Sequence, residues 1–140
     1  MLNLLRLANI TGNMEFEEKA EIISRVFAET VKRSPSAFTQ LMIAIDFGVG
    51  PSYSLVIAGD GDANDTDNMK KAIRKHFLPN KSILLRPTEQ KEPKIDNYSN
   101  FIHYFEKLNN KATAYVCINK TCKPPINNPN KLLELLDPKW

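Results

Sequence analysis

Residues 53–87 constrain the fold of this chain more than any other stretch. They contain two short apolar segments, 55–58 and 83–85, that are rich in branched side chains. Such segments are typical of strands buried on both faces of a sheet. Between the two segments, five residues recur at the spacing of one helical face: Met69, Ala72, Ile73, His76 and Phe77. The stretch therefore predicts a right-handed strand–helix–strand unit whose helix is capped by Asp65 or Thr66.

The first fifty residues predict a layer of three amphipathic helices joined by short turns. Gly12 ends the first helix, Asn13 caps the second, and the Ser34-Pro35 pair begins the third. Their apolar faces are too wide for three helices to bury, and apolar surface left in water costs about 25 cal/mol per Å². We therefore expect them to pack against the rest of the chain, a second copy or missing sequence. The side chains expected in that contact are Leu4, Leu5, Phe16, Ile23, Phe27 and Phe38.

Residues 51–140 are predicted to form a small α/β domain. After the central unit, a polar segment at 88–97 predicts a surface loop, and residues 98–108 predict a short helix. Alternating side chains at 112–118 predict a third strand, and Asn128-Pro129 is typical of the start of a last helix. The predicted fold class is α/β: an N-terminal helical layer followed by a small three-stranded, mainly parallel βαβ unit with flanking helices.

Composition argues against nucleic-acid and membrane partners. The chain has 140 residues, enough for one ordinary domain, and a net charge of +3 without a concentrated basic stripe. Its first ten residues do not resemble a signal peptide, and no apolar run approaches the length of a membrane span. We therefore expect a soluble, cytoplasmic protein with reduced thiols.

An acidic segment follows the first predicted strand, where open α/β sheets usually bind ligands. Its carboxylates, from Asp60, Asp62, Asp65 and Asp67, are oxygen ligands of the kind that hard cations prefer. The calcium-loop pattern fails, however, because Asp65 takes the glycine position and Lys71 takes the final glutamate position. The segment also lacks the glycine pattern of a phosphate-binding loop. We expect a solvated turn without a tightly bound metal, and keep a ligand loop as the alternative.

The two cysteines, Cys117 and Cys122, leave several interpretations open. They are five residues apart, which is not the C-x-x-C spacing of a thioredoxin-type motif. They could meet across a turn as a disulfide or redox pair, or supply two ligands of a metal site that needs two more. We expect inert thiols, with Cys117 buried in the third strand and Cys122 in a loop over residues 120–127, because buried cysteine commonly acts as a small hydrophobe.

The helix predicted after the acidic segment carries a basic face formed by Lys70, Lys71, Arg74 and Lys75. A charged helix face is usually solvated, and binding of an anion or an acidic partner is the alternative. The two histidines have ordinary structural explanations, and no Ser/His/Asp or paired-carboxylate arrangement stands out. We therefore expect no catalytic residue and no cofactor in this chain.

Several sequence blocks carry a resemblance to a known family. They lie at 35–40, 44–47, 75–81, 84–87, 114–117, 122–125, 128–129 and 132–133. Through them the chain resembles the thioredoxin-domain-containing, spermatogenesis-associated proteins over essentially all of its length. That resemblance implies a longer architecture: a thioredoxin-like domain, then an α/α toroid of the six-hairpin glycosidase type, then a small α/β segment at the end. The three N-terminal helices here would be the last toroid helices, and no catalytic residue of the family falls on this chain.

Three functions follow from these observations. The first is a non-catalytic accessory domain that packs on the toroid, with the missing N-terminal domains as its partner or self-association in their absence. The second is the contribution of a loop to a carbohydrate-handling or redox site in the complete protein. The third is a small module that binds an anion or an acidic partner. We expect the first, since neither the acidic segment nor the cysteine pair forms a recognisable catalytic pattern.

Overall fold

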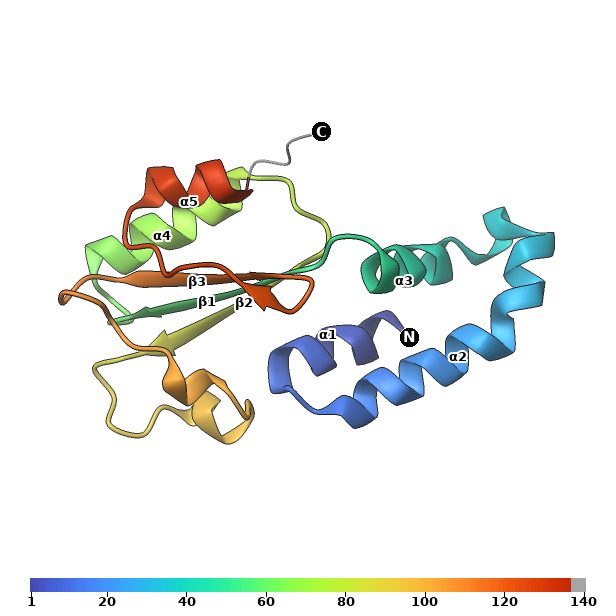
Figure 1. The fold of residues 1–140 in the computed structure, drawn as a ribbon, viewed down its shortest axis with the longest axis horizontal. Helices are drawn as coiled ribbons and strands as arrows, with labels where there is room; N and C mark the ends of the chain where they lie inside the picture. Colours follow the sequence, from blue (N-terminus) through green and yellow to red (C-terminus); the bar gives the residue numbers. More distant parts are fainter. Residues whose placement is uncertain (137–140) are drawn as a thin grey trace.

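The computed structural model describes residues 1–136 and shows a mixed α/β fold, as predicted (Figure 1). A four-stranded sheet carries two helices on one face, and three N-terminal helices lie beside its other face and its end. The prediction of one helical layer followed by a βαβ unit with flanking helices therefore describes the class of the fold correctly. The number and direction of the strands differ from the prediction, as described below.

The predicted central unit is present as β1 (Tyr53–Gly59), α4 (Asn64–Lys75) and β2 (Lys81–Pro87). β1 and β2 are parallel, with Leu55 opposite Ile83 and Ile57 opposite Leu85. The helix ends two residues earlier than predicted because His76 is extended, and Lys81 Nζ donates to the carbonyl oxygens of Ile73 (3.2 Å) and His76 (2.9 Å). The sequence predicts that Phe77, the residue after His76, packs on the sheet. That prediction is wrong, since Phe77 is 90% exposed.

The start of α4 also differs from the prediction. Its N-cap is Ala63, which offers no side-chain acceptor, so neither Asp65 nor Thr66 is the cap. Both lie inside the first turn, where Asp65 Oδ1 accepts a hydrogen bond from the backbone N–H of Thr66 at 2.9 Å. A carboxylate one residue into the helix still faces the positive end of the helix dipole.

The sheet has the order β2-β1-β3-β4, and only the β1–β2 pair is parallel. β3 (Thr113–Ile118) runs antiparallel to β1, because the connection over 88–112 begins and ends at the same edge of the sheet. That connection holds only the short 3-10 turns η2 (Lys94–Asn97) and η3 (Ile102–Tyr104), so the predicted helix at 98–108 is wrong. A strand that returns without a crossover helix is antiparallel.

A fourth strand, β4 (Thr121–Cys122), replaces part of the predicted loop. It pairs with β3 through a two-residue turn in which Asn119 and Lys120 have φ angles of 49° and 65°. Positive φ at both central positions is the signature of the type I′ hairpin turn. A second pair of this kind, Asn109 and Asn110, forms the turn just before β3.

The hydrophobic core lies between the sheet and the helices α4 and α5 (Pro129–Leu136), which cover one face in Figure 1. The predicted alternation along β3 is confirmed, since Ala114 and Val116 belong to this core. The other core residues are Leu55, Ile57, Met69, Ile73, Leu78, Ala112, Leu132 and Leu136. Asn128 accepts a hydrogen bond from Asn130 N at 2.9 Å and so starts α5 as its sequence predicts.

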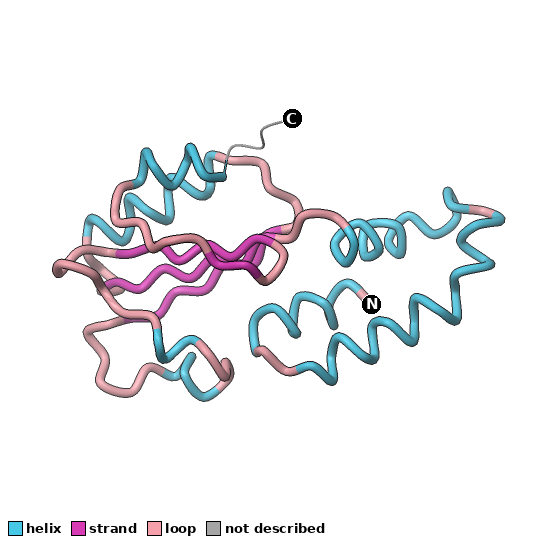
Figure 2. Tube along the Cα trace, in the orientation of Figure 1, coloured by secondary structure: helices cyan, strands magenta, loops and turns pink. Residues whose placement is uncertain are grey.

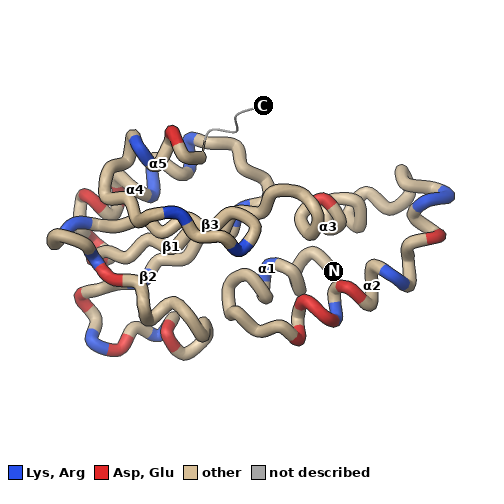
Figure 3. The backbone as a smooth tube through the Cα atoms, in the orientation of Figure 1, with Lys and Arg blue, Asp and Glu red and all other residues tan. Residues whose placement is uncertain are grey.

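The helical layer consists of α1 (Leu2–Thr11), α2 (Met14–Arg33), η1 (Pro35–Phe38) and α3 (Thr39–Val49) (Figure 2). Two predicted caps are confirmed: Gly12 ends α1 with φ 73°, and the side chain of Asn13 accepts from Glu15 N at 2.9 Å. The first turn after Pro35 is a 3-10 turn rather than the start of α3. α3 contains one charged residue, Asp46, and its trace is otherwise uncharged in Figure 3.

Within residues 1–136, no helix is both long enough and apolar enough to cross a lipid bilayer.

Candidate functional site

A mostly apolar pocket lies where the helical layer meets the second face of the sheet. It is an apolar cavity of about 320 Å³ enclosed by the α1–α2 turn, β1, the β3–β4 hairpin and residues 101–105. Its apolar walls come from Ala8, Met14, Val56, Phe101, Phe105 and the two cysteines. Asn9, Asn13 and Ser54 add neutral polar groups. A mostly apolar cavity of this size with few polar groups matches the usual character of a small-molecule or side-chain binding site.

The aromatic wall of the cavity is held by contacts with the α1 terminus and with β3. The backbone N–H of Asn100 donates to Thr11 O at 3.0 Å. A Cβ on Gly12 would stand only 3.1 Å from Cδ1 of Phe101, so glycine allows this close approach. The Phe105 ring in turn lies over Tyr115, with 4.5 Å between ring centroids.

Arg86 holds the segment that contains Phe101 and Phe105 in place. The Arg86 guanidinium donates to both carboxylate oxygens of Asp96, at 3.1 Å and 2.9 Å, and to the carbonyl oxygen of Phe105 at 3.3 Å. Both charged side chains are mostly buried, and a bidentate pair of this geometry is among the stronger polar contacts in proteins. The pair therefore ties residues 94–105 to β2.

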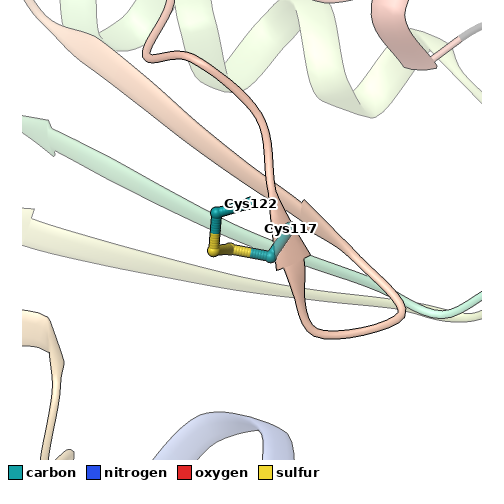
Figure 4. The surroundings of a disulfide bond; sticks show 2 residues. All are labelled: Cys117 and Cys122. Atoms are coloured by element: carbon teal, nitrogen blue, oxygen red, sulfur yellow. A yellow bond between two sulfur atoms is a disulfide. The ribbon is translucent and has the colours of Figure 1, made fainter.

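The two cysteines form a disulfide that borders the cavity (Figure 4). The expectation of inert free thiols is therefore wrong, and the cross-turn disulfide that the spacing left open is present. The reason is the type I′ turn, which sets Cys117 and Cys122 directly opposite one another in the hairpin register. Cys117 is half-buried on the face away from the core, and Cys122 is exposed.

An ion pair connects the same hairpin to the helical layer. Lys120, in the turn between the two cysteines, donates from Nζ to Glu17 Oε1 and Oε2 of α2, each at 2.7 Å. Among residues 1–136, Glu17 and Lys120 are the charged residues that line the cavity, and they neutralise one another. The cavity therefore favours neutral groups over charged ones.

The acidic segment does not gather its carboxylates at one point. Asp60 accepts from Lys107 Nζ at 2.7 Å and 2.8 Å and from Thr88 Oγ1 at 2.8 Å, and these hydrogen bonds hold the pKa of the Asp60 carboxyl below its ordinary value. Asp65 Oδ2 accepts from the backbone N–H of Ala112 at 2.7 Å. These carboxylates tie the β1–α4 loop to the neighbouring segments.

The other two acidic residues face solvent or basic neighbours. Asp62 is exposed, and Asp67 pairs with Lys71 at 2.7 Å and Lys70 at 3.6 Å. The hydrogen bond from Lys71 lowers the pKa of the Asp67 carboxyl, with help from the charges of both lysines. No group of three or more His, Cys, Asp or Glu residues within 1–136 is arranged to hold a metal ion.

The basic face borders a shallow groove between α4 and α5. Lys71, Arg74 and Lys75 line this groove, which has a volume of about 400 Å³, together with Asn130 and Leu133 of α5. Lys70 and Lys71 already pair with Asp67, which leaves Arg74 and Lys75 as the cations of the face without a recorded ion pair. Anion binding there stays a prediction.

The six side chains predicted to make the helical contact lie mainly within the layer. Leu4, Leu5, Phe16, Ile23 and Phe38 are half-buried, and Phe27 is partly exposed. The most exposed apolar side chains of the layer are their neighbours: Met14, Ile22 and Val26 on α2, and Met42, Ile43 and Val49 on α3.

Sequence reasoning missed the partners that complete these sites. Lys107 and Thr88 reach Asp60 from 47 and 28 residues away, and Glu17 reaches Lys120 from 103 residues away. No local pattern marks such pairs. The type I′ turn had a weak signal in Asn119, because asparagine tolerates positive φ better than most residues do.

Comparison with known proteins gives one clear relationship. No family model and no solved structure matches the chain. Human spermatogenesis-associated protein 20 is 31% identical over 136 residues, which is 97% of this chain and 17% of the human protein. The rat and mouse proteins of the same name are 28% and 27% identical over 134 residues, again 17% of their length. The chain is therefore a homologue of spermatogenesis-associated protein 20 that corresponds to a domain of that larger protein, consistent with its C-terminal part.

Proposed function

We propose that this chain is a non-catalytic accessory domain whose helical layer completes a larger helical assembly, the α/α toroid that the family resemblance implies. The observation that carries the proposal is α3, which is apolar on two opposite sides. Ala44 and Phe47 are buried on one side, whereas Met42 and Val49, seven residues apart, lie on the opposite side. Val49 is 83% exposed. A helix with apolar side chains on two opposite sides is typical of the interior of a larger structure.

The outer side of α2 supports the same proposal. Ile22 and Val26 lie one helical turn apart, and Val26 is 68% exposed. Exposed apolar side chains on both α2 and α3 are more apolar surface than an ordinary solvated helix face carries, which supports a role in an interface. The length of the relatives supports one choice of occupant, since this chain matches only 17% of each. We infer that the remainder of a longer polypeptide covers this surface.

The isolated chain tests this proposal by sedimentation over a wide concentration range. Without the covering domains, the exposed sides of α2 and α3 should self-associate and bind an apolar dye. Met42→Lys with Val49→Lys should weaken both effects, because these changes remove the exposed apolar side of α3 and leave that of α2. Thr30→Lys with Gln40→Lys adds the same two charges at exposed polar positions and should leave both unchanged. A strictly monomeric, folded wild-type chain that binds no dye would overturn the proposal.

The second function, participation in a redox site of the complete protein, has one specific observation in its favour: the disulfide that borders the apolar cavity.

We also propose the cytoplasm as the location of the protein. A cytosolic disulfide is usually transient and redox-active rather than structural. The carbohydrate-handling alternative rests on the family resemblance alone.

A further inference from the structure

The Cys117–Cys122 disulfide lies where it contributes least to holding the fold. It joins residues already set opposite one another by a two-residue turn, so the loop it closes is short. The stabilisation a disulfide gives grows with the length of that loop. β4 supplies no residue to the core, and both of its residues are exposed. The fold therefore keeps its core whether the bond is formed or broken.

The same bond is open to attack. Cys122 is exposed on the outermost strand of the sheet, and both cysteines line the 320 Å³ cavity. Disulfides that a thiolate can approach are the labile ones, whereas structural disulfides are shielded from it.

The hairpin that carries the bond is also coupled to the helical layer. Its turn is held by the Lys120–Glu17 pair, and β4 is followed by a backbone hydrogen bond from Lys123 N to Val116 O at 2.8 Å. Opening the disulfide would loosen this hydrogen bond and one wall of the cavity. Reduction of the two cysteines would thereby weaken the contact between the sheet and α2.

We propose that Cys117–Cys122 is a thiol–disulfide exchange site that accepts two electrons from a dithiol. One thiolate of the dithiol attacks Sγ of exposed Cys122, and the disulfide breaks with its electron pair on Sγ of Cys117. The second thiolate of the dithiol then attacks the sulfur bound to Cys122 and releases the Cys122 thiolate. The dithiol leaves as a disulfide, and the two protons that it lost are taken up by the two cysteine thiolates.

The first test compares the rates at which dithiothreitol reduces the native chain and the urea-unfolded chain, followed by alkylation and intact mass. An exchange site open to the reagent should be reduced in the folded state at a rate within about a hundredfold of the unfolded rate. A larger difference would show that reduction needs unfolding, and would overturn the proposal.

Single-cysteine variants test which of the two sulfurs a reagent can reach. With oxidised glutathione, Cys117→Ser should form the mixed disulfide at Cys122 at least about tenfold faster than Cys122→Ser forms it at Cys117, because Cys117 is half-buried. Equal or reversed rates would contradict the assignment of Cys122.

Hydrogen exchange and a double variant separate exchange chemistry from unfolding. On reduction, the Lys123 amide should lose protection while the amides of β1 keep theirs. Cys117→Ser with Cys122→Ser should fold, with a melting temperature within a few degrees of the oxidised chain. Loss of protection throughout the sheet, or failure of the double variant to fold, would make the bond a structural one and overturn the proposal.

Discussion

The two faces of the sheet differ in how completely they are packed. The face under α4 and α5 is a continuous apolar core to which both helices and the two central strands contribute. The opposite face meets the α1–α2 turn and residues 94–105, and it holds a cavity, a disulfide and a mostly buried ion pair. Buried hydroxyls without a hydrogen-bond partner among residues 1–136 occur in both regions: Thr66 on α4, and Ser82 and Ser99 outside the core under α4 and α5. The first face is covered by its own helices, whereas the second is suited to further contacts.

The largest expected effect on stability comes from shortening a side chain in the core under α4 and α5. Leu132→Ala should lower the free energy of unfolding by about 2–5 kcal/mol, because Leu132 is fully buried between α5 and the sheet and its loss leaves a cavity. Val49→Ala, on the exposed side of α3, should change it by less than about 0.5 kcal/mol. Urea denaturation measures both. A cost for Val49→Ala comparable to that for Leu132→Ala would mean that the helical layer is already covered.

Two glycines sharpen the comparison further. A Cβ on Gly59, at the end of β1, would stand 2.3 Å from Thr66 Oγ1 and 3.1 Å from Ala112 Cβ. Gly59→Ala should therefore destabilise the chain by about 1–3 kcal/mol through overpacking. A Cβ on Gly48, in α3, would meet only Leu5 Cδ1, at 3.5 Å, so Gly48→Ala should stabilise the chain by about 0.5 kcal/mol through helix propensity. Thermal unfolding measures both signs, and a stabilising Gly59→Ala would refute the close packing of α4 on β1.

The complete face is also the one that the sequence predicts well. The strands at 55–58 and 83–85, the helical spacing of Met69, Ala72 and Ile73, and the alternation along β3 follow from local patterns and are present. The expectation that 83–85 is buried on both faces is wrong, because β2 is an edge strand and Ile83 is 40% exposed. The sequence predicts too late an end for α4, because His76 and Phe77 continue the apolar spacing although the backbone is already extended at His76. Periodicity indicates which residues suit a helix face, and it does not indicate where the Lys81 side chain caps the last carbonyls.

The second face depends on contacts that no local pattern contains. The direction of β3 follows from where the 88–112 connection ends, and the disulfide follows from a turn without glycine. Arg86 and Asp96 are ten residues apart on a strand and a 3-10 turn, where no spacing rule pairs them. The sequence predicts that the three helices carry more apolar surface than they can bury. It does not predict which side chains of α2 and α3 are exposed. Their exposure depends on how the three helices rotate against one another, which amphipathicity alone leaves open.

The smallest expected effect tests the electrostatics at the carboxyl end of β1. Hydrogen bonds from Lys107 and Thr88, aided by the Lys107 charge and opposed by partial burial, lower the pKa of Asp60 from its ordinary 3.8. A lowered pKa in the folded state means that the unfolded chain binds more protons between the two values. The carboxylate therefore stabilises the fold above about pH 4, and this contribution is lost as the pH falls through the folded pKa. Asp60→Asn should be slightly less stable than the wild type at pH 7, and the two melting temperatures should converge below pH 4. Asp62→Asn, at an exposed carboxylate without a recorded hydrogen bond, serves as the matched control and should show no such convergence. A difference for Asp60→Asn that stays constant from pH 7 to pH 3 would show that the side chain acts through its shape and not through its charge.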